Sequence, residues 1–214
     1  MYKEFIFFIF IFCIIYFFFF YDNRIDWKAD NGQTYKIMDS KDPNLNKKKA
    51  NMLSEINDKA QKVVELMYNQ KVPTEKIATK TRQRFNKNFK IKETPMGEKS
   101  GAAYTINKGG LNGEMSVCLV TKGKLNNLND TFFVILHELA HVMSDSYGHG
   151  DEFKQNFNFI IAFAVKHDLW TDPKYENRNV DYCGVTVTSS PCSGNQCEEN
   201  TLNNFYKESL LDYK

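Results

Sequence analysis

The sequence predicts an α+β fold that follows an N-terminal transmembrane helix. Residues 5–21 form an unbroken apolar and aromatic run. Residues 132–143 are apolar around a whole helix apart from two histidines and a glutamate, which is typical of a buried helix. Residues 101–122 alternate polar and apolar side chains, as half-buried strands do. A chain of 214 residues accommodates these elements in one domain with an appendage.

The apolar run at residues 5–21 is seventeen residues long, which is close to the shortest helix that spans a membrane. Lys3 and Glu4 precede it, and charges of both signs follow, so its orientation is not set. A cleaved signal peptide and a buried core helix are the alternatives. A signal peptide needs small residues at its cleavage site, whereas this run ends in phenylalanines and a tyrosine. We therefore expect residues 1–28 to form a single-pass membrane anchor and its flank.

The rest of the chain divides into one domain at residues 29–192 and a polar tail at residues 193–214. The net charge is only +2, but it is unevenly spread. Residues 41–92 carry 14 Lys and Arg against 5 Asp and Glu, whereas residues 130–214 carry 6 against 13. A basic half can bind nucleic acid or an anionic membrane surface. Because lysine-rich helix faces are common and no recognition motif accompanies this one, we favour a solvated surface.

Further elements are expected on both sides of the predicted strands. Asp42 and Pro43 fit the N-cap and first position of a helix whose apolar spacing continues to Tyr68. Gly109 and Gly110 separate the two strands within residues 101–122. The other expected elements are a short strand at 34–37, an exposed helix at 73–84, a cap at Asn129 and Asp130 for the buried helix, and an amphipathic helix from 153 to 168.

The buried helix carries the motif that points to chemistry, His137-Glu138-Leu139-Ala140-His141. Residues four apart lie on one face of a helix, so His137 and His141 can bind one metal ion together. Glu138 can reach a water molecule on that ion. Two imidazoles and a carboxylate are costly in an apolar setting unless they are paired or coordinated, and a metal removes that cost. The alternative is a chance match on a solvated helix face, which the apolar flanks disfavour.

A catalytic zinc site needs a third protein ligand and one open position. His149 is the best candidate for this ligand. Gly148 and Gly150 flank it, and they allow the backbone to turn sharply and bring the imidazole back to the helix.

Three acidic residues are alternatives to His149 as the third ligand. Asp145 lies one turn beyond His141, where it could instead orient an imidazole. Asp151 and Glu152 lie where the next helix begins, and acids are favoured there by the helix dipole. The sequence leaves these candidates open.

The segment from His137 to Phe153 resembles the zincin metallopeptidases. The pattern is most similar to the WLM and SprT-like group, in which His-Glu-Leu-x-His precedes a His-Gly-x-x-Phe segment. It also resembles uncharacterised WLM-like proteins of large DNA viruses, together with a Tyr-Cys-Gly segment that is Tyr182-Cys183-Gly184 here. The resemblance covers residues 30–192. The chain departs from the metzincin spacing and begins with an apolar segment that nuclear repair proteases of the group would not need.

The resemblance implies a zincin-like fold, in which a small antiparallel or mixed sheet packs on the helix that carries the motif. It implies that His137, His141 and His149 bind zinc and that Glu138 is the catalytic acid and base. In zincins an edge strand beside the metal helix holds the substrate as an added strand. One of the two strands within residues 101–122 would fill that role here, and residues 115–121 are the first choice.

The leading hypothesis is therefore a zinc metallopeptidase that acts on a protein or peptide substrate. Tyr147 is a candidate for stabilising the oxyanion, although its direction is not set by the sequence. A non-catalytic, zinc-stabilised binding module at the membrane is one alternative, and the intact Glu138 argues against it. A WLM-type DNA-dependent protease, with the basic region on nucleic acid, is another, and the predicted membrane segment argues against it.

The five cysteines are an odd number, which leaves at least one of them outside any disulfide within the chain. Cys183, Cys192 and Cys197 have a poor spacing for a zinc knuckle and lack a fourth ligand. One disulfide among these three fits an oxidising compartment, and free thiols fit a reducing one. Cys13 and Cys118 complete the set.

Overall fold

The computed structural model describes residues 11, 22–95, 101–106, 113–197, 207, 210 and 211. Within these residues the fold is α+β, as predicted. The strands are β1 (Arg24–Lys28), β2 (Thr34–Met38), β3 (Lys90–Glu93), β4 (Ala103–Ile106), β5 (Glu114–Val117), β6 (Val120–Thr121), β7 (Lys124–Leu125), β8 (Val180–Tyr182) and β9 (Val185–Val187). The helices are α2 (Pro43–Gln70), α3 (Glu75–Arg84), α4 (Leu128–Met143) and α5 (Asp151–Lys166), with a 3-10 helix η2 (Tyr175–Asn177).

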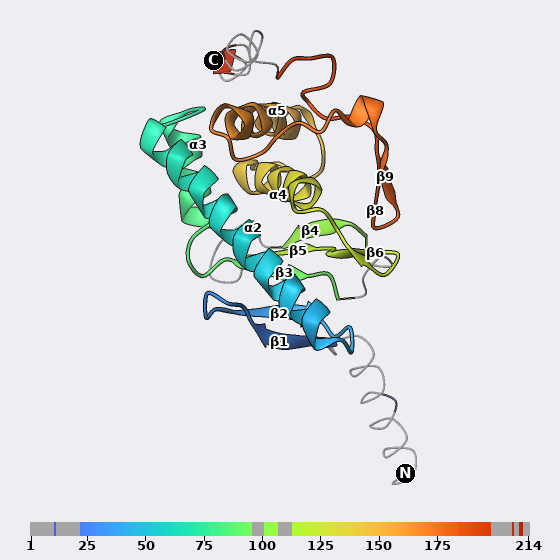
Figure 1. Ribbon diagram of the computed structural model, residues 1–214. Coiled ribbons are helices and arrows are strands. Elements are labelled where there is room, and N and C mark those ends of the chain that lie inside the picture. The colour runs from blue at the N-terminus through green and yellow to red at the C-terminus, as the bar shows by residue number, and fades with distance from the viewer. Residues whose placement is uncertain are drawn as a thin grey trace.

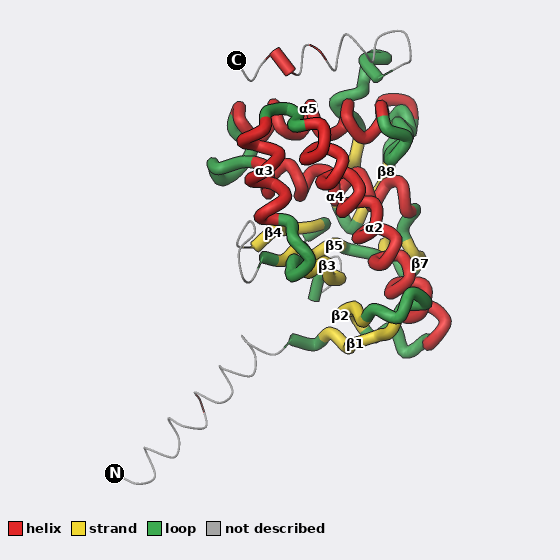
Figure 2. Tube along the Cα trace, turned by 90° about the vertical axis from the view of Figure 1, so that its left-hand side faces the viewer, coloured by secondary structure: helices red, strands yellow, loops and turns green. Residues whose placement is uncertain are grey.

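A small mixed sheet lies at the centre of the fold. Its strand order is β3-β5-β4, with β3 parallel and β4 antiparallel to β5. The β1–β2 hairpin is a separate antiparallel pair on the β3 side of this sheet. Figure 1 shows α4 and α5 above the strands and α2 running obliquely past them. Figure 2, turned by 90°, shows the same division between a helical layer and the strands. The predicted small sheet is thus present, and β4 is one of its edges.

Helix α2 begins where the sequence predicted. Asp42 caps it by accepting a hydrogen bond from the Asn44 N–H (2.9 Å), and Pro43 takes the first position. The helix continues two residues beyond the predicted end at Tyr68. It stops where Lys71 adopts a left-handed conformation with φ of 57°. Its apolar face is buried, so the helix is held by packing as well as by its cap.

Helix α4 is a buried helix, and Phe132, Ile135 and Leu139 are fully enclosed. Its N-cap is Asn127, whose side chain accepts from the Asn129 N–H (2.8 Å), so the predicted cap at Asn129 and Asp130 is wrong.

Asp130 has a different role from the predicted cap. Its carboxylate accepts hydrogen bonds from the Tyr175 hydroxyl (3.0 Å) and from the Arg178 guanidinium (2.9 Å). Asp130 is buried, and these two bonds compensate for the loss of water around its charge. They also fasten the segment after α5 to the start of α4.

The predicted single-pass transmembrane helix, and the membrane location that rested on it, must be corrected. Among the described residues no helix is long and apolar enough to cross a bilayer, which takes about 20 apolar residues. The segment 5–21, to which the anchor was assigned, lies outside the described residues except for Ile11. Strand β1 falls in the segment predicted to flank the anchor, and the Arg24 guanidinium donates to the Glu93 carbonyl (3.1 Å). The folded unit therefore includes Arg24.

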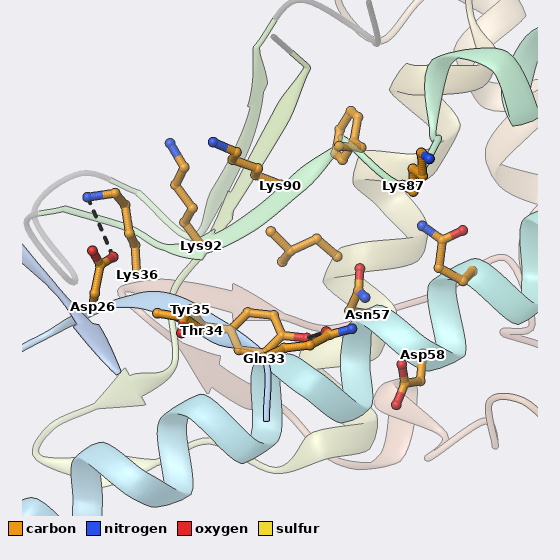
Figure 3. A pocket seen from close by; sticks show the side chains of 13 residues that line it. Asp26, Gln33, Thr34, Tyr35, Lys36, Asn57, Asp58, Lys87, Lys90 and Lys92 are labelled. Atoms are coloured by element: carbon orange, nitrogen blue, oxygen red, sulfur yellow. Dashed lines mark hydrogen bonds and ion pairs between the residues drawn. The ribbon is translucent and has the colours of Figure 1, made fainter. Parts of the chain in front are cut away.

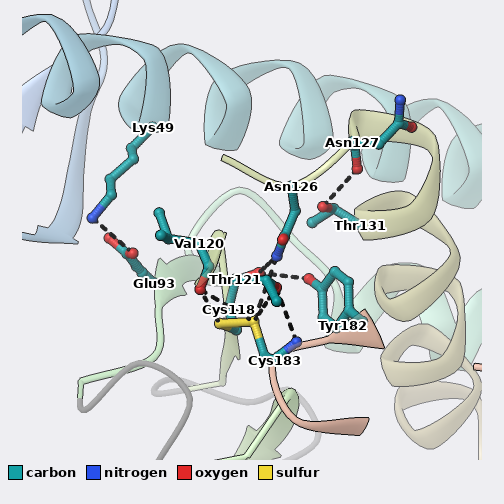
Figure 4. The surroundings of a disulfide bond; sticks show 10 residues. All are labelled: Lys49, Glu93, Cys118, Val120, Thr121, Asn126, Asn127, Thr131, Tyr182 and Cys183. Carbon is teal, nitrogen blue, oxygen red and sulfur yellow. Dashed lines mark hydrogen bonds and ion pairs between the residues drawn. A yellow bond between two sulfur atoms is a disulfide. The ribbon is translucent and has the colours of Figure 1, made fainter. Parts of the chain in front are cut away.

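Two disulfides join four of the cysteines, Cys118 to Cys183 and Cys192 to Cys197. Cys13 lies outside the described residues. Of the two alternatives for Cys183, Cys192 and Cys197, one disulfide among the three is present as Cys192–Cys197. The bridge from Cys183 was not predicted, because it spans 65 residues and reaches the end of β5. Figure 4 shows this bridge beside the Tyr182 hydroxyl, which donates to the Cys118 carbonyl (2.6 Å). The β8–β9 hairpin is thereby fastened to the central sheet.

Candidate metal centre

Helix α4 presents His137 and His141 one turn apart on the same face. The Nε2 atom of His149 lies 3.0 Å from that of His137 and 3.2 Å from that of His141. One nitrogen from each of the three rings lies within 4.8 Å of the others. Zinc–imidazole bonds of about 2.0–2.1 Å in a tetrahedron place ligand nitrogens at separations close to these. The three rings therefore converge on a volume that fits a single metal ion.

The protonation state of His137 also suits a metal ligand. Burial, together with the neighbouring His141 and His149, lowers the pKa of His137 to about 4. Its imidazole is therefore neutral near pH 7, and neutral imidazole is the form that binds metals. No Cys, Asp or Glu side chain from the described part of the chain joins the three rings. A tetrahedral ion at this point would keep one position that no described residue fills.

The loop after α4 returns His149 to the helix, and a left-handed Gly148 (φ of 79°) makes the turn. The Glu152 carboxylate fixes the loop, because it accepts hydrogen bonds from the backbone N–H groups of Asp145 and Ser146 (2.8 Å each). The Arg84 guanidinium binds the end of α4 through the carbonyl of Ser144 (2.9 Å).

The three acidic alternatives to His149 are directed elsewhere. Asp145 forms ion pairs with Lys80 (2.9 Å) and Arg84 (2.6 Å), and hydrogen bonds from these two cations lower the pKa of its carboxyl group. Glu152 holds the loop as described. The Asp151 side chain is 95% exposed and lies 3.6 Å from Lys154. The structure brings His149, and none of these acids, to the histidine pair.

Glu138 lies next to the three rings and is 4% exposed. The Thr105 hydroxyl donates a hydrogen bond of 2.6 Å to its Oε2 atom. Burial raises the pKa of Glu138 to about 7, and the hydrogen bond from Thr105 opposes this shift. Thr105 was not among the predicted site residues, because its contact with Glu138 joins residues 33 positions apart and leaves no local pattern in the sequence.

A cavity of about 320 Å³ opens beside the histidines and Glu138. Strand β4 forms one wall with Ala103 to Thr105, and Tyr147 and Gly148 form another. Tyr147 is 87% exposed, and its role as an oxyanion donor stays a prediction. The choice of residues 115–121 as the edge strand beside the site is wrong. Among the described strands β5 is bonded on both sides, and β4 is the edge that lies beside the site.

Two aromatic rings of α5 support the histidines from the core. The Phe153 ring centroid lies 4.3 Å from that of His141, 4.6 Å from that of His149 and 4.8 Å from that of His137. Phe157 lies 5.1 Å from His137. Phe153 is buried and Phe157 is partly buried, on the helix that the sequence predicted as amphipathic. Their packing restricts the rotation of the imidazoles and so keeps the three nitrogens together.

Comparisons with known proteins give two partial relatives. No family model matches the chain, and no solved structure matches it. Uncharacterized protein R325 of Acanthamoeba polyphaga mimivirus is 31% identical over 87 residues, which cover 40% of this chain and 43% of that protein. Uncharacterized protein 136R of Invertebrate iridescent virus 6 is 33% identical over 85 residues, which cover 38% and 44%. The chain thus spans less than half of each relative, and both relatives are proteins of large DNA viruses.

Proposed function

We propose that the chain is a zinc metallopeptidase that hydrolyses peptide bonds in a protein or peptide substrate. The observation that carries the proposal is the convergence of three histidine nitrogens beside a buried glutamate and an open sheet edge. A purely structural zinc site is usually closed by a fourth protein ligand and has no use for such a carboxylate. The His-Glu-x-x-His sequence and the following His-Gly-x-x-Phe segment support a zincin of the WLM or SprT-like kind.

In this proposal His137, His141 and His149 hold the zinc ion. When bound, the ion would supply Lewis-acid activation of a water molecule and of the substrate carbonyl. Phe153 restricts the rings from behind, so the ligands need little rearrangement on binding. The donor set, three imidazole nitrogens and no thiolate, is one that catalytic zinc sites use.

Glu138 is the general base and then the general acid. Its carboxylate takes a proton from the attacking water and afterwards gives a proton to the nitrogen of the leaving amine. The Thr105 hydrogen bond occupies Oε2 and restricts the carboxylate to one orientation. Thr105 is thus a positioning residue, since it acts through Glu138.

The edge of β4 that no described strand pairs would hold the substrate as an added antiparallel strand. The Cys118 N–H donates to the Ala102 carbonyl (2.8 Å), so these two residues form a hydrogen-bonded pair at the end of the β4–β5 ladder. Hydrogen-bonded pairs alternate along an antiparallel ladder. The backbone groups of Tyr104 therefore face β5, whereas those of Ala103 and Thr105 face the open edge beside the cavity. A peptide bonded to them would run past the three histidines.

The experiment that tests the proposal measures cleavage of an unfolded protein, such as reduced casein, by the full-length chain. We expect cleavage to cease when a chelator removes the metal, and to return when zinc is added back. Activity that persists at full rate after the metal has been removed would contradict the proposal. Bound zinc without cleavage of any of a panel of unfolded proteins would favour a non-catalytic binding module.

Replacing Thr105 should lower activity without removing the metal. Thr105→Val keeps the shape of the side chain but loses the hydroxyl that donates to Glu138. We expect kcat to fall about tenfold, which corresponds to one hydrogen bond to a charged group. Thr105→Ser retains the donor and should recover most of the rate. Zinc content should be equal in all three proteins, and a Thr105→Val protein with the parent's kcat would exclude the positioning role.

A further inference from the structure

A second cavity, of about 750 Å³, separates the β1–β2 hairpin from β3. It lies at the β3 edge of the mixed sheet, whereas the histidines lie at the β4 edge. Figure 3 shows its walls: β2 on one side, β3 and the residues before it on the other, and α2 residues Asn57 and Asp58 beside them. We call this cavity the β2–β3 groove. Nothing in the proposed peptidase mechanism uses it.

Strand β2 turns backbone hydrogen-bonding groups toward the groove. The Ala29 N–H donates to the Gln33 carbonyl (2.8 Å), so these two residues form a hydrogen-bonded pair of the β1–β2 ladder. Every second pair along the strands is hydrogen-bonded in the same way. The backbone groups of Lys36 and Met38 therefore face away from β1. The direction is visible at Met38, whose N–H donates to the Glu93 carboxylate (2.7 Å) across the end of the groove.

Strand β3 also turns backbone hydrogen-bonding groups toward the groove, from the opposite wall. The Lys90 N–H donates to the Gly113 carbonyl (3.2 Å), and the Thr94 N–H to the Val117 carbonyl (3.0 Å). Alternate residues of a strand bond to opposite neighbours, so the backbone groups of Ile91 face the groove. Within the described residues no hydrogen-bonded ladder joins β2 to β3. The groove is thus bordered by two strand edges that no described strand pairs.

The groove is closed and fixed at one end by buried charges. The Lys49 ammonium lies 2.9 Å from the Glu93 carboxylate, and the two side chains are 4% and 3% exposed (Figure 4). Lys49 also donates to the Met38 carbonyl (2.9 Å), and Arg24 donates to the Glu93 carbonyl (3.1 Å). These bonds fasten the hairpin to β3 at this end. They hold the two walls in place here without a ligand.

The charge of the groove favours an acidic occupant. Four lysines line it, against Asp26 and Asp58. Lys36 lies 3.8 Å from Asp26, and Lys92 is paired with Glu114 outside the groove. The other two, Lys87 and Lys90, are exposed.

Lys87 and Lys90 form no ion pair with any described residue. Figure 3 shows Lys90 and Lys92 extending from β3 on the same side. Carboxylates on a bound chain would therefore meet ammonium groups that lack a partner within the described fold.

We propose that the β2–β3 groove binds a short, extended, acidic peptide segment of a partner protein. Strand edges supply backbone hydrogen bonds to extended peptides, and the lysines select acidic side chains. A single-stranded nucleic acid fits less well. Its bases need exposed aromatic rings to stack on, whereas Tyr35 and Phe89, the aromatic residues of the groove, are only 8% and 6% exposed.

The test uses the full-length chain and a fluorescent peptide of about eight residues in which Glu and Thr alternate. Fluorescence anisotropy should show binding that weakens as salt is added. Lys87→Glu/Lys90→Glu should weaken it about tenfold or more. The matched control is Lys48→Glu/Lys76→Glu, which makes the same change in charge at exposed lysines outside the groove and should bind as the parent does. Circular dichroism should show both double variants folded.

Three outcomes would overturn the proposal. Equal weakening in both double variants would mean that only total charge matters. Tighter binding of an oligonucleotide of equal charge, lost in Lys87→Glu/Lys90→Glu, would assign the groove to nucleic acid. Unchanged binding of a peptide methylated on alternate backbone nitrogens would exclude pairing with the strand edges. Because the histidines lie at the other sheet edge, binding should persist after the metal is chelated, which separates this proposal from the peptidase.

Discussion

Glu138→Gln is expected to abolish peptide hydrolysis while the protein stays folded and keeps its metal. The amide has the size of the carboxylate but cannot take a proton from water. General base catalysis contributes about 10²–10⁴-fold, so the rate should fall by about that factor. Glu138 is not one of the three converging residues, so zinc content should match that of the parent. The measurement compares casein cleavage and zinc content on the same preparations.

The control for this variant is Glu55→Gln. Glu55 carries the same side chain, but it is an exposed residue of α2 and lies outside the cavity. Its replacement should leave hydrolysis of the same order as in the parent. If Glu138→Gln cleaves as fast as the parent, the activity does not come from this site. If both variants lose activity equally, the loss does not come from a general base at Glu138.

His149→Ala should remove metal and activity together. It deletes one of three converging nitrogens and leaves only the pair on α4. We expect zinc affinity to fall by about 10²-fold or more, because replacing a residue that only orients a metal ligand already costs about 10–100-fold. Competition with a fluorescent chelator measures this affinity at fixed pH.

Asp151→Ala is the matched variant, since it alters an exposed acid two residues away that was itself a candidate ligand. It should bind zinc as tightly as the parent. An unchanged zinc affinity in His149→Ala, together with a reduced zinc affinity in Asp151→Ala, would show that Asp151 and not His149 is the third zinc ligand. The resemblance to WLM-like peptidases would then weaken, since that pattern has histidine at this point.

The parts of the site that the sequence predicted are those encoded locally. His137 and His141 lie four residues apart on a helix, so their shared face follows from helix geometry alone. His149 follows after a short loop with a left-handed glycine, and Gly148 itself predicted the turn. The helix at Asp42 was also predicted, because its cap and its proline are adjacent in the chain.

The parts that the sequence did not predict depend on contacts between distant residues. Thr105 reaches Glu138 only because β4 packs beside α4, and Cys118 reaches Cys183 across 65 residues. The cap of α4 is Asn127, whereas Asp130 binds the segment after α5. Asn127, Asn129 and Asp130 all have side chains that can cap a helix, so the sequence alone does not distinguish their roles.

The edge strand was misassigned for a related reason. Residues 115–121 and 103–107 alternate equally well, and alternation does not reveal which strand acquires a second neighbour. Strand β3, at Lys90–Glu93, pairs with β5 and places it in the centre of the sheet. The membrane anchor was predicted from the apolar run at 5–21 for a different reason. The length and hydropathy of a segment can fit a membrane span without establishing one.

X-ray absorption at the zinc edge of the full-length chain tests the central claim most directly. We expect about one zinc per chain with three imidazole nitrogens at about 2.0–2.1 Å and a further oxygen ligand. A folded chain that takes up no zinc would contradict it. Sulfur ligands at about 2.3 Å would also contradict it, because they would place the metal on cysteines rather than on His137, His141 and His149.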